Sequence, residues 1–127
     1  MVDPVSVDLE GKRLLVVEDE YLIAIDLAYF LEGLGAEIVG PAGSVEDALE
    51  LVASHDGLDG AVLDINLRGR RVFPVADALA SRNVPFVFTT GYDALVVPDE
   101  YESVPRCEKP IDQRLLASLI ARLGSER

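Results

Sequence analysis

The sequence predicts an α/β fold built on a parallel sheet. Five short apolar runs alternate along the 127 residues with segments whose apolar residues recur at helical spacing. Hydrophobic residues make up 50% of the chain, which is enough for one buried core. Strands that alternate with helices form βαβ units with right-handed crossovers. For five such units we expect a flavodoxin-like, doubly wound five-stranded parallel sheet in the order 2-1-3-4-5.

The expected strands are short and almost entirely apolar, as in sheets that helices cover on both faces. They lie at 14–17, 37–40, 61–63 and 85–89, with a weaker one at 104–108. Between them, the apolar residues of one helical face recur over 23–34, 45–52, 72–80 and 115–123. Ser44 and Asp112 stand where helix N-caps are expected, and Gly35 and Gly124 stand where helices end.

The segment 91–103, where a further helix of such a fold would lie, has no sustained period of 3.6 residues. It contains Pro98 and three acidic residues within four positions, Asp99, Glu100 and Glu102. We therefore expect the fourth helix to be short, irregular or mobile.

The charge balance excludes several classes of protein. With 11 basic and 23 acidic residues, the net charge of −12 disfavours binding to nucleic acid or to an anionic membrane surface. We find no apolar run long enough to span a membrane and no signal peptide. The single cysteine, Cys107, indicates a buried side chain in a cytoplasmic protein, and the single histidine, His55, indicates a helix cap.

Acidic side chains stand where two of the apolar runs end. Glu18 and Asp19 follow the first run, and Asp64 follows the third. In the expected order these strands are neighbours, and a ligand crevice lies outside their carboxyl ends. Three carboxylates so close repel one another, and a hard divalent cation with all-oxygen ligands removes that cost. The sequence therefore predicts a Mg²⁺ site, the alternative being solvated or helix-capping acids.

Two more runs end in residues suited to an anion. Thr90 offers a hydroxyl donor, and Lys109 offers a fixed positive charge. A carboxylate nucleophile, a cation, a hydroxyl and an ammonium are the parts that phosphoryl transfer requires. Because Asp64 stands alone on the central strand, we expect it to accept the phosphoryl group as an acyl phosphate. We expect Glu18 and Asp19 to serve mainly in binding the metal ion.

The motifs at the ends of these runs, taken in their order along the chain, resemble those of the receiver domain of two-component response regulators. The resemblance covers about residues 12–123. The motifs are Glu18-Asp19, Leu63-Asp64-Ile65-Asn66-Leu67, Thr90-Gly91 and Lys109-Pro110. The resemblance implies a phosphoacceptor switch that is not a turnover enzyme. It also implies a single receiver domain over 1–127 with no output domain.

For the metal, the resemblance implies that Asp64 and Asp19 bind Mg²⁺ directly and that Glu18 acts through a water. The backbone carbonyl of Asn66 would complete the protein ligands, and Mn²⁺ is an expected substitute. Asp64 would take the phosphoryl group from a histidine on a partner kinase.

For the switch, the resemblance implies that Thr90 binds a phosphoryl oxygen and shifts on activation. Lys109 would pair with the phosphoryl group, and its bond to the following proline is often cis in this family. The usual aromatic residue three positions before the lysine is replaced by Arg106. We therefore expect Tyr92, or the segment 91–103, to carry the conformational change.

The segment 86–92 is similar to the Phe-Ala-Thr-Gly-X-Tyr signature of a subgroup of single-domain receivers, with Tyr92 one place early. That subgroup is associated with sensor histidine kinases of the HWE type. The expected partners are such a kinase, a histidine phosphotransfer protein and an unknown downstream protein. We expect no nucleic acid, no membrane insertion, and a monomer or weak dimer.

Three alternatives have a sequence feature against them. A phosphatase of the haloacid dehalogenase type requires an Asp where Asn66 stands. A flavin mononucleotide binder requires a Ser/Thr/Gly-rich loop where the acidic run 18–20 stands. A degenerate receiver would lack the intact site.

Arg68, Arg70 and Arg71 either guide an acidic partner or phosphodonor, or form a solvated loop.

Overall fold

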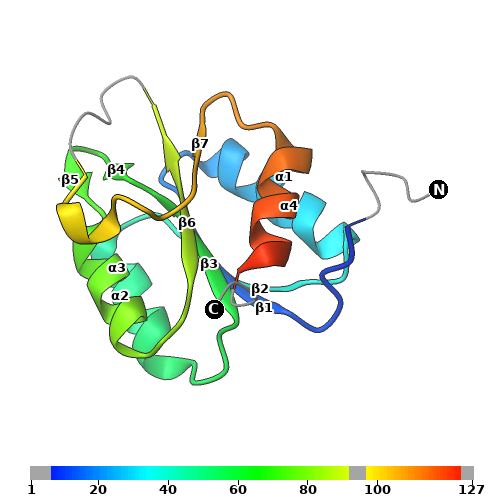
Figure 1. The fold of residues 1–127 in the computed structure, drawn as a ribbon, viewed down its shortest axis with the longest axis horizontal. Helices are drawn as coiled ribbons and strands as arrows, with labels where there is room; N and C mark the ends of the chain where they lie inside the picture. The colour runs from blue at the N-terminus through cyan, green and yellow to red at the C-terminus, as the bar shows by residue number, and fades with distance from the viewer. Residues whose placement is uncertain (1–6, 92–96, 124–127) are drawn as a thin grey trace.

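The centre of the protein is a five-stranded parallel sheet (Figure 1). A computed structural model describes residues 7–91 and 97–123. The sheet has the order β2-β1-β3-β6-β7, which is the predicted order 2-1-3-4-5 for these five strands. The strands are β1 (Arg13–Val17), β2 (Glu37–Ala42), β3 (Gly60–Asp64), β6 (Phe86–Thr90) and β7 (Arg106–Glu108).

Helices cover both faces of the sheet (Figure 1). On one face lie α1 (Tyr21–Gly33) and α4 (Gln113–Arg122), and on the other lie α2 (Val45–Ser54) and α3 (Phe73–Ser81). This arrangement confirms the predicted doubly wound fold. No helix in the part of the chain that the structure describes is both long enough and apolar enough to cross a membrane.

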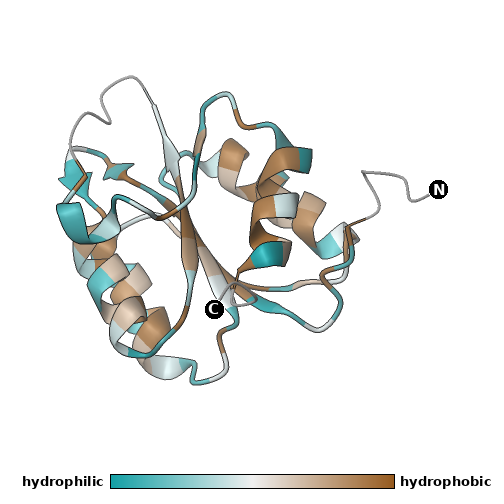
Figure 2. Ribbon diagram, in the orientation of Figure 1, coloured by the Kyte–Doolittle hydropathy of each residue, from teal (hydrophilic) through white to brown (hydrophobic). Residues whose placement is uncertain are grey.

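Two hydrophobic cores result, because successive strand residues point to opposite faces of the sheet. Val16 and Val62 pack in the core beneath α1 and α4, whereas Val17 and Leu63 pack in the core beneath α2 and α3. Figure 2 shows hydrophobic residues along the central strands and hydrophilic residues at β5 (Arg70–Arg71) and η1 (Asp99–Tyr101). Cys107 is a free, buried cysteine of the first core, as predicted.

The helix ends confirm the caps expected from the sequence. The Ser44 Oγ accepts the backbone N–H of Asp47 at 3.1 Å, and Asp112 Oδ1 accepts the N–H of Arg114 at 3.0 Å. At the end of α2, His55 Nδ1 donates to the Leu51 carbonyl at 2.9 Å. Each contact satisfies a backbone group that the end of a helix leaves without a partner.

The described part of the segment between β6 and β7 contains one short 3₁₀ helix, η1 (Asp99–Tyr101), and no α-helix. This confirms the expectation of an irregular fourth helix for those residues. Tyr101 is buried, stacks on Phe73 and meets Phe88 edge-on, and its hydroxyl donates to Asp77 Oδ1. The sequence pattern of this segment gives no sign of the aromatic cluster, because it lacks helical periodicity.

A two-stranded hairpin directly after β3 was also not predicted. It consists of β4 (Asn66–Leu67) and β5 (Arg70–Arg71), joined by Arg68 and Gly69. Both turn residues have positive φ, 54° and 87°, as in the type I′ turns of tight hairpins. The hairpin lies immediately beyond the carboxyl end of the central strand.

Candidate functional site

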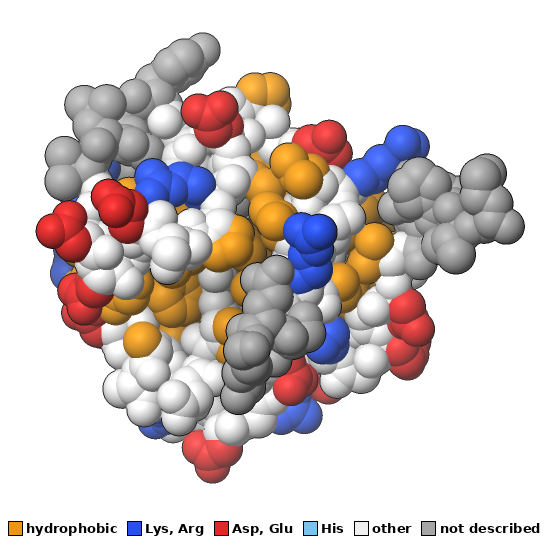
Figure 3. Space-filling model, viewed as in Figure 1, with side chains coloured by type: hydrophobic (Ala, Val, Ile, Leu, Met, Phe, Trp, Pro, Cys, Tyr) orange, Lys and Arg blue, Asp and Glu red, His pale blue; other side chains and the backbone are white. Residues whose placement is uncertain are grey.

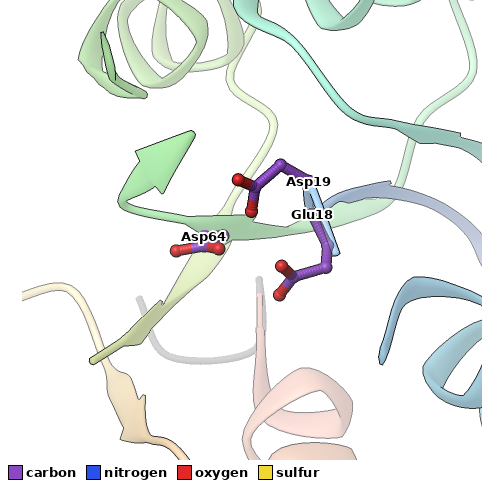
Figure 4. A group of neighbouring side chains, drawn as sticks. All are labelled: Glu18, Asp19 and Asp64. Atoms are coloured by element: carbon purple, nitrogen blue, oxygen red, sulfur yellow. The ribbon is translucent and has the colours of Figure 1, made fainter. Parts of the chain in front are cut away.

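Three carboxylates meet at the carboxyl ends of β1 and β3, as the sequence predicted (Figure 4). Glu18 and Asp19 follow β1, and Asp64 is the last residue of β3. One carboxylate oxygen of each lies within 4.8 Å of the others. Glu18 and Asp64 are each only 4% exposed, whereas Asp19 is half-buried. The two central strands therefore place the acids side by side.

Backbone N–H groups hold two of these carboxylates in place. Glu18 Oε2 accepts the N–H of Glu20 at 3.0 Å, and Asp64 Oδ1 accepts the N–H of Asn66 at 3.1 Å. Each carboxylate thus bonds to the chain two residues further on, a local pattern that fixes the side chain where a strand becomes a loop.

Lys109 joins the two buried carboxylates. Its Nζ lies 2.9 Å from Asp64 Oδ2 and 3.0 Å from Glu18 Oε1. The backbone N–H of Lys109 donates to the Thr90 carbonyl at 2.8 Å, and the Lys109–Pro110 bond is cis, as the resemblance implied. Lys109, which directly follows β7, therefore contacts residues at the ends of β1, β3 and β6.

The electrostatics of the site follow from burial and from this ammonium. Burial acts to lower the pKa of Lys109, but the bonds to Asp64 and Glu18 outweigh it, so that the pKa is raised. Burial raises the pKa of Glu18 to about 7, although its bonds to Glu20 and Lys109 oppose the shift. The neighbouring charge of Asp64 adds to the rise. The three carboxylates carry more negative charge than the half-buried Lys109 ammonium compensates.

The donor set fits a hard divalent cation. Three carboxylates with one lysine leave a formal charge of −2 at this spot, and the converging atoms are all oxygens. Asn66 begins β4, and its side-chain oxygen accepts the Gly69 N–H at 2.8 Å. Its backbone carbonyl as a ligand stays a prediction.

Of the three remaining residues in the predicted switch, the structure describes Thr90 and Arg106. Thr90 is buried at the end of β6, opposite Glu108 in the register with β7. Tyr92 lies outside the described residues. Arg106 is exposed on β7, so that the strand carries no aromatic toward Thr90.

An apolar groove beside the site did not emerge from the sequence. It has a volume of about 510 Å³, and Lys109 lines it at the boundary with the carboxylates. Leu22, on the α1 wall, is 80% exposed, and Tyr29 further along the same helix is 78% exposed. Figure 3 shows hydrophobic side chains at the surface where α1 and α4 lie. The signal was present in α1, whose apolar residues exceed those that one buried face requires.

Comparison with known proteins places this arrangement in a family. The fold superposes on that of SdrG from Sphingomonas melonis Fr1 with a TM-score of 0.76, at 42% identity, covering 87% of this chain and 93% of SdrG. It also superposes on a response regulator receiver protein from Sinorhizobium medicae with a TM-score of 0.75, at 26% identity, covering 91% and 95%. The chain belongs to the response regulator receiver domains.

The curated relatives that the chain matches are longer proteins. The transcriptional regulatory protein PdtaR of Mycobacterium tuberculosis is 38% identical over 82 residues, 64% of this receiver and 40% of PdtaR. The chain spans less than half of the length of each curated relative that it matches. SdrG has also been solved in a BeF3-activated conformation, at 41% identity and a TM-score of 0.71, covering 91% of this chain and 98% of that structure. No protein-family model matches the chain.

Proposed function

We propose that this receiver accepts a phosphoryl group on Asp64 from a phosphorylated histidine of a partner kinase, in a reaction that requires Mg²⁺. The observation that carries the proposal is the position of Asp64. It ends the central strand, nine-tenths or more buried, within 4.8 Å of two further carboxylates and hydrogen-bonded to Lys109.

In the transfer, an Asp64 carboxylate oxygen attacks phosphorus while the bond from phosphorus to the histidine nitrogen breaks. The electron pair of that bond returns to the imidazole, and an acyl phosphate forms on Asp64. Asp19 and Asp64, with Glu18 acting through a water, would hold a divalent cation, which would neutralise charge on the phosphoryl oxygens.

The residues of the chain supply the other parts of the reaction. The Lys109 ammonium, already 2.9 Å from Asp64, remains beside the group that becomes attached there. The Thr90 hydroxyl at the end of β6 donates to a phosphoryl oxygen. Its movement, together with residues between β6 and β7, changes the surface that a downstream protein reads. Tyr92 is the proposed second participant.

The groove beside Lys109 supports a protein phosphodonor. A histidine side chain can approach Asp64 only if its carrier docks next to the site, and the groove with Leu22 and Ile111 offers an apolar surface at that place. We propose a sensor histidine kinase of the HWE type, or a histidine phosphotransfer protein, as the donor. The BeF3-activated conformation of SdrG supports activation by a phosphoryl mimic.

The output would be phosphorylation-dependent binding of another protein, or the draining of phosphoryl groups from the kinase. A cytoplasmic location and a single receiver domain over 1–127 belong to the same proposal. The receiver would assist its own phosphorylation and dephosphorylation without acting as a turnover enzyme. The subunit would be monomeric or weakly dimeric.

Intact-mass measurement after incubation with Mg²⁺ and acetyl phosphate tests the proposal. The wild type should gain one phosphoryl group, and Asp64→Asn should not. Asp56→Asn, a matched change at a fully exposed aspartate outside the site, should be labelled like the wild type. Equal labelling of Asp64→Asn and the wild type would refute the assignment, and labelling that persists in excess chelator would refute the metal requirement.

A further inference from the structure

Arg68 occupies an unusual position at the mouth of the site. It is the first residue of the turn between β4 and β5 and has a φ of 54°. That left-handed conformation suits Gly or Asn, and it costs most other residues roughly 1 kcal/mol. The turn keeps an arginine there all the same.

The hairpin fixes the Arg68 backbone relative to the carboxylates. Gly69 N–H donates to Asn66 Oδ1 at 2.8 Å, and Val72 N–H donates to the Ile65 carbonyl at 2.9 Å. Asn66 is itself bonded to Asp64. From this anchored turn the Arg68 side chain reaches Asp19, with 3.9 Å between Nε and Oδ2.

The two cationic side chains at the site pair with different carboxylates. Lys109 contacts Glu18 and Asp64 at hydrogen-bonding distance and is 20% exposed. Among the described residues, Asp19 has its ion pair with Arg68 instead. That pair is loose, because its atoms are beyond hydrogen-bonding distance and the arginine side chain is 79% exposed.

We propose that Arg68 is a displaceable counter-ion of Asp19. The Arg68 guanidinium competes with the divalent cation for the Asp19 carboxylate and so lowers the Mg²⁺ affinity of the unphosphorylated receiver. The inference rests on the proposed function, since it takes the cation site as given. A cation that binds Asp19 displaces the loosely held guanidinium, whereas Lys109 stays on the two buried carboxylates.

The size of the effect follows from Coulomb repulsion between the cation and the Arg68 guanidinium, whose side chain is 79% exposed and therefore screened by solvent. One positive charge beside a carboxylate that binds a dication weakens that binding by about three- to tenfold at low salt, and by less at high salt. Removing the Arg68 charge should therefore lower the Mg²⁺ dissociation constant by that factor.

Titration of the unphosphorylated protein with Mg²⁺, followed by ¹H–¹⁵N NMR, tests the inference. Arg68→Asn removes the charge and suits the left-handed turn, so folding is retained. Arg71→Gln removes the same charge from the next strand of the hairpin, at an exposed residue whose side chain has no ion pair in the described structure. We expect Arg68→Asn to bind Mg²⁺ more tightly than the wild type. Arg71→Gln should change the Mg²⁺ affinity little, and Arg68→Lys should leave it unchanged.

The outcomes separate this inference from the proposed function. Equal affinities of the wild type and Arg68→Asn, or equal tightening in both neutral variants, would overturn the counter-ion role and leave the cation site intact. A wild type that binds no Mg²⁺ would overturn the cation site itself, and the counter-ion role with it. Raising the salt concentration should shrink the difference between Arg68→Asn and the wild type, and a difference independent of salt would contradict a charge effect.

Discussion

The Lys109 ammonium lies 2.9 Å from Asp64 Oδ2, and the two residues are 45 positions apart in the sequence. The same nitrogen lies 3.0 Å from Glu18 Oε1. The ends of β1 and β3 are therefore held by one charge from the loop after β7. Two nearly buried carboxylates depend on it for neutralisation.

Lys109→Met should destabilise the metal-free protein by about 2–4 kcal/mol at pH 7.5, because it leaves two buried carboxylates without their cation. Millimolar Mg²⁺ should restore part of the loss, since it supplies positive charge at the same place. Urea unfolding with and without Mg²⁺ measures both effects. Lys12→Met, at a lysine with no ion pair to the site, should change stability by less than about 0.5 kcal/mol, and an equal loss in both variants would contradict the explanation.

Glu18 should make the stability of the metal-free protein fall as pH rises. Its pKa is raised from 4.5 to about 7, so the folded state binds more protons than the unfolded state within that window. The free energy of unfolding therefore decreases from pH 4.5 upward and levels off above pH 7, by on the order of 1–3 kcal/mol from this group.

Urea unfolding at pH 5 and pH 7.5 measures this slope. Glu18→Gln should flatten it, because the amide carries no titratable proton, and Glu20→Gln, at an exposed neighbour, should leave it as in the wild type. Mg²⁺ should stabilise the wild type more at pH 7.5 than at pH 5, since it binds the deprotonated form. A wild-type slope that persists in Glu18→Gln would assign the titration to another group.

Tyr101 should contribute to stability through its hydroxyl as well as its ring. The hydroxyl donates to Asp77, and burial together with that bond raises the pKa of Tyr101. Tyr101→Phe should cost about 0.5–1.5 kcal/mol in thermal or urea unfolding, because it removes the hydrogen bond of a buried hydroxyl, whereas water can solvate the exposed Asp77 carboxylate. Tyr29→Phe, at a tyrosine 78% exposed, should be neutral, and similar losses in both would contradict the role of the Asp77 bond.

The sequence was sufficient for the sheet and for the meeting of the three carboxylates, because both depend on local pattern. Val16 and Val62 alternate with Val17 and Leu63, and this alternation defines two faces whatever covers them. Once the strand order follows, the acids after β1 and β3 must meet, since parallel strands bring their carboxyl ends to one edge.

The features that escaped prediction depend on contacts between distant segments or on unusual backbone. Tyr101 lies in a segment without periodicity, and its burial arises from Phe73 and Phe88, which belong to other elements. The hairpin after β3 carries Arg68 where a type I′ turn normally has Asn or Gly, so Gly69 alone remains of the usual two-residue turn signal.

Thr90 should act on the phosphoryl group and not on the metal. Thr90→Val removes the hydroxyl at nearly constant shape, and it should weaken the binding of beryllofluoride by about tenfold or more, because a hydrogen bond to a charged group contributes roughly 1.5–3 kcal/mol. Mg²⁺ affinity should be unchanged, since the three carboxylates that could hold the ion are intact. Both are measured by NMR titration of the same samples.

Thr89→Val is the matched control for this prediction. Thr89 precedes Thr90 on β6 and is equally buried, but the alternation of the strand directs its side chain to the opposite face of the sheet. Beryllofluoride affinity in Thr89→Val should therefore match the wild type, and Thr90→Ser, which keeps the hydroxyl, should retain most of it. If both valine variants weakened beryllofluoride binding equally, the effect would come from the packing of β6, and Thr90 would have no direct part in holding the phosphoryl group.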